Sequence, residues 1–210
     1  EMCIRDRIKG IVFDLGFSYN QIKDSSKGLS FNYKGKLNMQ MGQNKISAQE
    51  VINYLTANEL DKIFRFFGEE KYSKIISKKI VKNGKHKEIH TEDLVKIINL
   101  AKKNYTKKNK STKVFQALRI FVNNEISELI IGLSKSCNLV SKNGVIAVVT
   151  FHSIEDRICK FFFNELSSLR KISRYLPLDN SSEVSFDLIK KKPIIPTKTE
   201  IEKNLSSRSA

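Results

Sequence analysis

The chain contains two short apolar runs, and segments with helical periodicity occupy much of the interval between them. The first run, residues 8–16, is apolar and β-branched, and Gly10 and Gly16 bound it, which predicts a short buried strand. The second, VIAVVTF at residues 145–151, predicts a strand that is buried on both faces. Continuous apolar strands that alternate with helices indicate an open sheet of parallel strands and an α/β fold.

Helices are predicted wherever apolar residues recur at steps of three and four. Two capping boxes, Ser47-x-x-Glu50 and Thr56-x-x-Glu59, open the first two helices, and Gly68 ends the second. The same periodicity predicts further helices over these ranges: 69–83, 91–104, 114–138 and 155–169. The block between the two strands is therefore mainly helical.

Residues 17–46 lack clear periodicity and are rich in Gly, Ser, Asn and Lys. Loops of this length inside a domain are uncommon and usually functional or disordered. This one contains scattered apolar side chains, which indicate an ordered loop that packs onto the protein: Leu29, Phe31, Leu37, Met39 and Met41.

Polar residues follow both predicted strands. Asp14 ends the first and is followed by Gly16, which lets the backbone turn or approach a ligand closely. Its carboxylate either accepts a hydrogen bond from an amine or hydroxyl of a ligand or caps the next turn. In open α/β sheets ligands bind outside the carboxyl ends of the strands, so both strand ends are candidate sites.

The second strand end carries FHSIEDR, residues 151–157. Its polar side chains could bind a ligand. Alternatively, Ser153 caps the next helix and Asp156 stands at the third position of that helix. A Ser–His hydrolase is disfavoured, because adjacent residues on an extended strand point to opposite faces. His152 and Ser153 remain candidates for lining a ligand pocket.

The charge of the chain indicates the kind of partner that it binds. Thirty-eight Lys and Arg against 22 Asp and Glu give a net charge of +16, which favours polyanions such as nucleic acid. Residues 71–113 hold 14 Lys and three acidic residues, a net of +11. Either this segment forms a binding face, or it is a solvated surface in a lysine-rich composition.

Several site classes find little support. The three cysteines, Cys3, Cys137 and Cys159, are far apart, which fits a reduced cytosolic protein without zinc or disulfides. His86 and His90 have the i, i+4 spacing of a metal pair but no third ligand nearby, so we expect no metal site. No apolar run approaches the roughly 18 residues of a membrane span.

IVFDLGFS is also similar to the metal-binding Asp-Phe-Gly turn of protein kinases. A kinase needs an Ala-Pro-Glu segment downstream, and the chain has none. The kinase alternative is therefore weak.

Seven blocks of sequence then carry a specific resemblance. In order, they are GIVFDLGFSYNQI, KGLSF, KLNMQM, FGEEKYSKIISKKIV, VFQALRIFVNNEISEL, TFHSIEDRICKFF and KKPIIPTKTEIEKNLSSRSA. Together they resemble the MraW/RsmH family, S-adenosylmethionine-dependent enzymes that methylate N4 of a cytidine in 16S ribosomal RNA. The resemblance covers about residues 8–210. Residues 1–7, EMCIRDR, fit no predicted element and suggest a segment foreign to the protein.

The resemblance implies a fold of the α/β class, with a partial Rossmann-like class I methyltransferase core and an inserted all-helical domain. Residues 1–46 would form a strand and an active-site loop of the core. Residues 47–110 would form the helical insertion, whose lysines face the ribosomal RNA. Residues 111–210 would supply the remainder of the core and a C-terminal tail.

The cofactor that the resemblance implies is S-adenosyl-L-methionine. The matching contacts are Asp14, of the Asp-Leu-Gly sequence, and Gln21, seven residues on. The family also has a Gly-rich strand-turn-helix and an acidic residue for the ribose, which this sequence does not include. We therefore expect the 210 residues alone to bind S-adenosylmethionine weakly or not at all. A non-catalytic RNA-binding remnant without the cofactor cradle is the alternative.

The implied partner is the 16S ribosomal RNA of the small ribosomal subunit, in the cytoplasm. The candidate RNA contacts are Ser18, Asn38, His152, Ser153 and Arg157. The chain departs from the family where it has DLGFSY for DLGVSS and LNMQM for LDMRM, and where Leu205-Ser206 replaces a Pro-Arg pair. No catalytic residue is assigned, and the target nucleotide and the oligomeric state stay open.

Overall fold

The structure, a computed structural model, describes residues 8–42, 46–84, 88–102, 109–167, 186–204 and 207. The predictions for residues 1–7, His86 and the Leu205-Ser206 pair fall outside these residues. The chain is a mixed α/β protein, mostly helical, with a small parallel sheet. It divides into two compact units: unit 1 comprises Glu1–Gly16 and Ile130–Ala210, and unit 2 comprises Phe17–Leu129.

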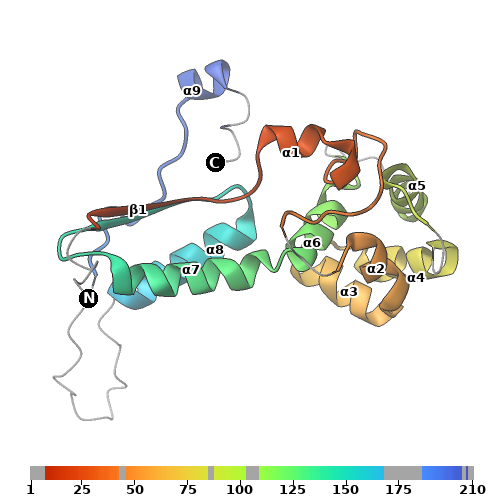
Figure 1. The fold of residues 1–210 in the computed structure, drawn as a ribbon, viewed down its shortest axis with the longest axis horizontal. Coiled ribbons are helices and arrows are strands. Elements are labelled where there is room, and N and C mark those ends of the chain that lie inside the picture. The colour runs from red at the N-terminus through yellow and green to blue at the C-terminus, as the bar shows by residue number, and fades with distance from the viewer. Residues whose placement is uncertain are drawn as a thin grey trace, which may run out of the picture. The chain divides into compact units, whose positions relative to one another are not determined.

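Unit 2 is helical (Figure 1). Its elements are α1 (Tyr19–Lys23), the 3-10 turn η2 (Ser25–Lys27), α2 (Ala48–Tyr54), α3 (Ala57–Phe66), α4 (Ser73–Gly84), α5 (Thr91–Ala101), α6 (Thr112–Val122) and the first residues of α7 (Glu125–Leu139). Both predicted capping boxes are confirmed. The backbone N–H of Glu50 donates to Ser47 Oγ at 3.2 Å, and that of Ser47 donates to Glu50 Oε2 at 2.7 Å. Thr56 and Glu59 do the same for α3.

The main core lies in unit 2, where α4 packs against α2, α3 and α5, and α6 packs against α2 and α3. Its centre consists of fully buried large side chains from four helices: Leu60, Phe64, Ile76, Ile80, Leu94 and Leu118. Burying one such side chain stabilises a fold by about 1.5–3 kcal/mol, so this unit has a core of its own.

The predicted packing of the segment after Gly16 is confirmed, because Leu29, Leu37 and Met39 are buried. The prediction of a loop without regular structure was wrong, since α1 and η2 lie in it. These helices have five and three residues, too few to show a helical period. Thr91 holds the loop: its hydroxyl donates to the carbonyl of Tyr33 at 2.7 Å and accepts from the N–H of Gly35 at 3.1 Å.

The prediction of one helix over residues 114–138 was also wrong, because two helices, α6 and α7, occupy this range and a short turn separates them. Asn124 lies at the break with φ of 51°. Asn reaches this left-handed region more easily than most residues, and Asn123 is the C-cap of α6. Other helix ends differ by a few residues: α4 begins at Ser73 and α8 at Ser153.

Unit 1 contains β1 (Gly10–Asp14), β2 (Val145–Val149), most of α7, α8 (Ser153–Ser167) and α9 (Lys198–Lys203). The two strands pair in parallel, from Gly10 opposite Val145 to Asp14 opposite Val149. α7 runs along one face of the pair (Figure 1), where a Cβ on Gly132 would lie 3.1 Å from the Phe13 ring.

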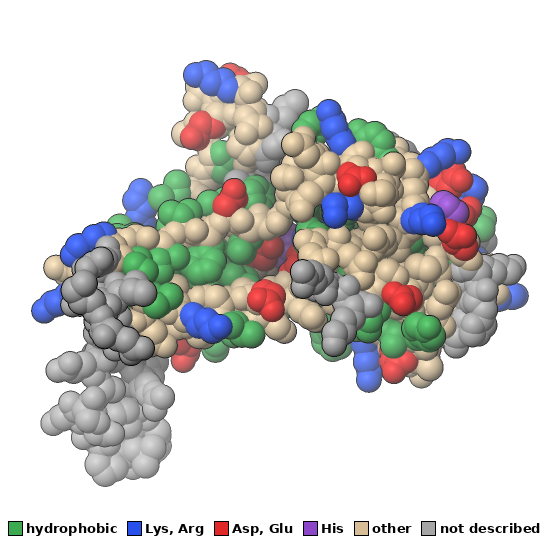
Figure 2. All heavy atoms as spheres, in the orientation of Figure 1, with side chains coloured by type: hydrophobic (Ala, Val, Ile, Leu, Met, Phe, Trp, Pro, Cys, Tyr) green, Lys and Arg blue, Asp and Glu red, His purple; other side chains and the backbone are tan. Residues whose placement is uncertain are grey.

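The prediction that β2 is buried on both faces was wrong. Burial alternates along β1 and along β2 as far as Val148: the face of Phe13 and Val148 is partly buried, whereas Val12 on the opposite face is 73% exposed. Apolar composition shows that a strand can be buried but not what covers each face. Figure 2 shows hydrophobic side chains at the surface over the part of unit 1 that holds β1 and α7.

Candidate functional site

Asp14 lies at the carboxyl end of β1 with an exposed side chain. The N–H of the next residue, Leu15, still donates to the carbonyl of Val149 at 3.2 Å, so the pairing runs to the strand end. Gly16 follows with φ of 101°, and a Cβ there would lie 3.6 Å from the Phe151 ring. The turn therefore leaves a carboxylate beside the end of the neighbouring strand.

The segment after β2 is organised by the buried side chain of Glu155. Its Oε2 accepts the backbone N–H of Phe151 at 2.9 Å, and its Oε1 lies 3.0 Å from His152 Nε2. That ring nitrogen is buried and makes no hydrogen bond among the described residues. His152 Nδ1 in turn accepts from the backbone N–H of Glu155 at 3.4 Å.

This geometry shows whether Ser153 caps α8. Ser153 is the first residue of the helix rather than its cap, and the N–H of Glu155 turns to the imidazole of His152. Capping by Ser153 was therefore the wrong alternative. Ser153 and Arg157 are exposed four residues apart, so both lie on one outer face of α8.

In unit 2, Ser18 and Gln21 form a capping box at the start of α1. The N–H of Gln21 donates to Ser18 Oγ at 3.3 Å, and the N–H of Ser18 donates to Gln21 Oε1 at 2.9 Å. The side-chain oxygen of Gln21 is thus engaged in the cap. The Ser-x-x-Gln spacing indicates this short helix, which was not predicted from the sequence.

Asn38 lies in the same loop, next to a backbone position of unusual conformation. Its Oδ1 is buried and has no hydrogen-bond partner among the described residues. Met39 follows with φ of 61° and is fully buried. A non-glycine residue at such a φ is strained and persists only where the surroundings hold it.

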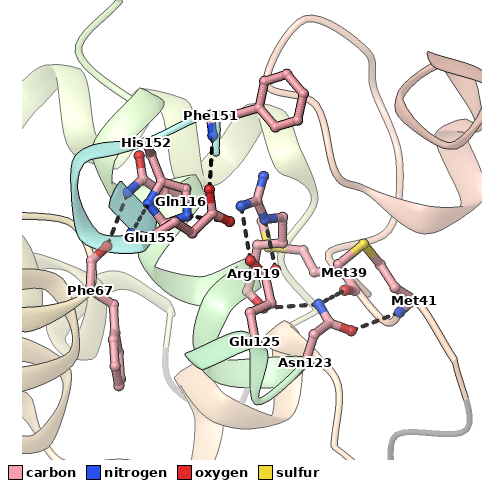
Figure 3. Close-up of polar contacts among 10 residues, drawn as sticks. All are labelled: Met39, Met41, Phe67, Gln116, Arg119, Asn123, Glu125, Phe151, His152 and Glu155. Carbon is pink, nitrogen blue, oxygen red and sulfur yellow. Dashed lines mark hydrogen bonds and ion pairs between the residues drawn. The ribbon is translucent and has the colours of Figure 1, made fainter. Parts of the chain in front are cut away.

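The side chain of Asn123, at the end of α6, holds this part of the loop (Figure 3). Its amide nitrogen donates to the carbonyl of Met39 at 2.8 Å, and its oxygen accepts from the N–H of Met41 at 2.8 Å. One amide therefore holds the backbone on the C-terminal side of the strained residue. This role was not predicted from the sequence, although two adjacent Asn residues in a predicted helix are poor helix formers.

Arg119, one turn earlier on α6, holds the beginning of the loop. Its guanidinium group binds Glu125 through two hydrogen bonds of 2.8 and 2.9 Å (Figure 3). The same group lies 4.5 Å from the centroid of the Phe17 ring. Such bidentate pairs are among the stronger hydrogen-bonded contacts of side chains, so α6 anchors the loop at both of its ends.

The lysine-rich segment does not form a single face. Lys102 is buried, with its ammonium group on Glu70 and on the carbonyl of Lys110. Lys113 donates to the carbonyl of Glu69 at 2.7 Å. These lysines serve the fold, whereas Lys78 and other lysines of α4 are exposed.

Each unit thus brings together its own set of predicted site residues. Unit 1 places Asp14, His152, Ser153 and Arg157 at or just beyond the carboxyl ends of two paired strands. Unit 2 places Ser18 in contact with Gln21, and Asn38 further along the loop. In the part of the chain that the structure describes, no helix is long and apolar enough to cross a membrane.

A small parallel sheet with polar side chains beyond its strand ends is typical of ligand-binding proteins of the α/β type. The particular family follows from sequence comparison: the chain belongs to the MraW methylase family, whose sequence model matches residues 3–210. The expected resemblance is confirmed, and the kinase alternative is removed.

Curated relatives agree. The chain is 38% identical to the ribosomal RNA small subunit methyltransferase H of Bartonella bacilliformis, over 99% of this chain and 63% of that protein. Its identity to the proteins of that name is 38% in Fusobacterium nucleatum (98% of this chain, 66% of that protein) and 43% in Wigglesworthia glossinidia brevipalpis (97% and 68%). The chain therefore spans about two thirds of the length of these relatives.

Proposed function

We propose that this protein transfers a methyl group from S-adenosylmethionine to the N4 amine of a cytidine in the 16S ribosomal RNA of the small subunit, in the cytoplasm. The observation that carries the proposal is the similarity to proteins named ribosomal RNA small subunit methyltransferase H, which extends over 97–99% of this chain. That alignment spans both strand ends and the loop with the candidate contacts.

The proposed architecture is a Rossmann-like class I methyltransferase core with a helical insertion. Residues 1–46 and 111–210 would belong to the core, and residues 47–110 would form the insertion. Parallel pairing of β1 with β2 supports the core, because two parallel strands require a crossover between them. The series of helices from α2 to α5 supports the insertion.

In this proposal Asp14 and Gln21 contact the cofactor. The exposed carboxylate of Asp14, at a strand end, can accept hydrogen bonds from an amine or a hydroxyl group. The Oε1 atom of Gln21 caps α1, which leaves its amide NH₂ group as the donor toward a ligand. These donors and acceptors fit the polar parts of S-adenosylmethionine, whose sulfonium group supplies an electrophilic methyl.

The candidate RNA contacts fall into two sets. His152 and Ser153 would line the pocket for the flipped base, since a base must leave its stack to be methylated. Glu155 would position them through its contacts with Phe151 and His152. Ser18 and Asn38 would contact the substrate from the loop of unit 2, and Arg157 would bind a phosphate.

In this reaction the main task of the protein is to place the cytosine amine correctly relative to the methyl group. The lone pair of a cytosine N4 amine is delocalised into the ring, so the amine is a weak nucleophile. Holding it in line with the methyl group and accepting its N–H bonds as it pyramidalises lower the barrier. No covalent cysteine is required, which agrees with the raised pKa of the buried Cys159 thiol, about 11.

The proposal is tested in cells that carry Asp14→Ala in the gene for this protein. Nucleoside mass spectrometry of their 16S ribosomal RNA should show a loss of N4-methylated cytidine, with Asp156→Asn on α8 as the control that retains it. Asp156 contacts Lys160 at 2.7 Å and is not itself one of the proposed contacts. An unchanged amount of N4-methylated cytidine in the Asp14→Ala cells would refute the proposed reaction or the role of Asp14. Deletion of the gene distinguishes the two.

A further inference from the structure

α4 carries a row of lysines on its outer surface. Lys71 precedes the helix, and Lys74, Lys78 and Lys82 follow at steps of three, four and four, all of them exposed. Residues at these steps lie along one side of a helix, and the last three span about 12 Å at 1.5 Å per residue. We call these four residues the lysine ridge.

The ridge is costly for the helix that carries it. Like charges four residues apart destabilise a helix by about 0.2–0.5 kcal/mol per pair, and a lysine in the first turn opposes the helix dipole. α4 has no acidic residue to offset this. In contrast, α5 has Glu92 and Asp93 in its first turn. Stability alone therefore does not account for the ridge.

Several other described lysines of unit 2 are engaged in the fold. Lys96 contacts Asp93 at 3.2 Å, Lys34 contacts Glu92 at 2.9 Å, and Lys102 is buried on Glu70. Among the residues that the structure describes, no ion pair involves the lysine ridge. The ridge is thus a concentration of uncompensated positive charge that is free to meet an anionic partner.

The inner side of α4 excludes one such partner. Ile76 and Ile80 are fully buried in the core of unit 2, so the helix cannot insert an apolar face into a bilayer. Outside, only Ile75 and Tyr72 are exposed apolar residues of this helix and the turn before it, at 49% and 39%. Lysine is a point charge without the planar fork that reads base edges, which suits phosphates.

We propose that the lysine ridge binds the phosphodiester backbone of RNA without reading its bases. This proposal rests on the proposed function and names the surface of unit 2 that holds the ribosomal RNA. Neutralised phosphates release counterions, so the logarithm of the binding constant falls with the logarithm of the salt concentration by about 0.7 per phosphate for single strands.

The test compares two variants of the full chain that each lose three positive charges. K74Q/K78Q/K82Q removes most of the ridge, and K34Q/K36Q/K96Q removes lysines that contact acidic residues. Glutamine keeps helix propensity, and circular dichroism verifies folding. Binding of a fluorescent oligouridylate of about 20 nucleotides is followed by anisotropy between about 50 and 200 mM salt.

We expect the ridge variant to lower the salt slope by about two units and the affinity at low salt at least tenfold. The paired-lysine variant should change the slope by less than one unit. K74R/K78R/K82R should retain the slope of the unaltered chain, because charge rather than side-chain shape is at issue. Equal slopes for the two glutamine variants would overturn the proposal, as would an unaltered chain that does not bind this RNA.

One further measurement distinguishes RNA from a lipid surface as the partner of the lysine ridge. Vesicles of phosphatidylglycerol and phosphatidylcholine should bind the unaltered chain and the ridge variant equally weakly. Strong, ridge-dependent vesicle binding would overturn the RNA assignment in favour of a lipid surface. The anisotropy assay contains no cofactor, and the Asp14→Ala cells carry an intact ridge, so failure of the ridge proposal and failure of the proposed reaction give different results.

Discussion

The two units of this protein bury their apolar residues in different ways. In unit 2 the helices and the loop of residues 17–42 enclose a continuous core, with Phe64 and Leu118 fully buried. In unit 1, α7 covers one face of the strand pair, and Val12 on the other face is 73% exposed. Similar apolar content therefore yields a closed core in one unit and a one-sided sheet in the other.

This difference indicates that, among the described residues, unit 2 contributes most of the stability. A two-stranded sheet is marginally stable without further packing, whereas helices closed around a core gain from every buried side chain. We expect unit 2 to tolerate core truncation poorly, and the exposed sheet face of unit 1 to tolerate polar substitution well.

The largest expected effect is Phe64→Ala, which removes a fully buried ring between helices. It should lower the free energy of unfolding of unit 2 by about 3–5 kcal/mol. Val12→Thr, which keeps the β-branched shape on an exposed face, should cost about 0.5 kcal/mol or less. Hydrogen-exchange mass spectrometry in urea reports on each unit separately. Equal costs for the two variants would break the comparison.

Glu70→Gln should come next, because it leaves the buried Lys102 ammonium group without a counter-charge. Breaking one partner of a buried pair costs about 3 kcal/mol or more. The control in unit 1 is Asp156→Asn, since the Lys160–Asp156 pair is half exposed and worth about 1 kcal/mol or less. Urea unfolding measures both. Adding Lys102→Met to Glu70→Gln should recover part of the loss, and an unrecovered double variant would contradict the charge explanation.

Gly28→Ala should have a smaller effect, of about 2 kcal/mol. Gly28 has φ of 60°, and a Cβ there would lie 2.0 Å from the carbonyl oxygen of Lys36. In unit 1, Gly10→Ala meets nothing closer than 3.8 Å and should change stability by about 0.5 kcal/mol or less. Thermal unfolding by circular dichroism measures both variants, and a neutral Gly28→Ala would show that the loop shifts at little cost.

The last prediction concerns thiol reactivity in unit 1, which does not alter the stability of either unit. Burial, with the nearby charges of Glu155 and Asp156, raises the pKa of Cys159 from 9.0 to about 11. Because the thiolate is the reactive form, Cys159 should hold about a hundredfold less thiolate at pH 8 than an ordinary thiol. Iodoacetamide followed by peptide mapping should label it slowly in the native chain and quickly in urea. Its native rate should rise with pH up to about 11, and fast native labelling at pH 8 would show that this part of unit 1 is open.

Local signals were enough to predict several features. The strand cores, the two glutamate capping boxes and the placement of Asp14 at a strand end all depend on neighbours within a few residues, and the structure confirms them. The break at Asn124 and the short helix α1 were missed, because each depends on one or two residues whose preference the surrounding periodicity outweighs. Their signals, an Asn pair and a Ser-x-x-Gln spacing, are short and common.

The sequence by itself determined the family and the order of strands, helices and candidate contacts, because motifs and periodicity are written in neighbouring residues. Only the tertiary structure decided which lysines are available and which are buried, as the contrast between Lys78 and Lys102 shows. It alone joined Asn123 to the loop at Met39, 84 positions away in the chain. The physical reason is that burial and long-range hydrogen bonds depend on which segments meet, and no local pattern specifies that meeting.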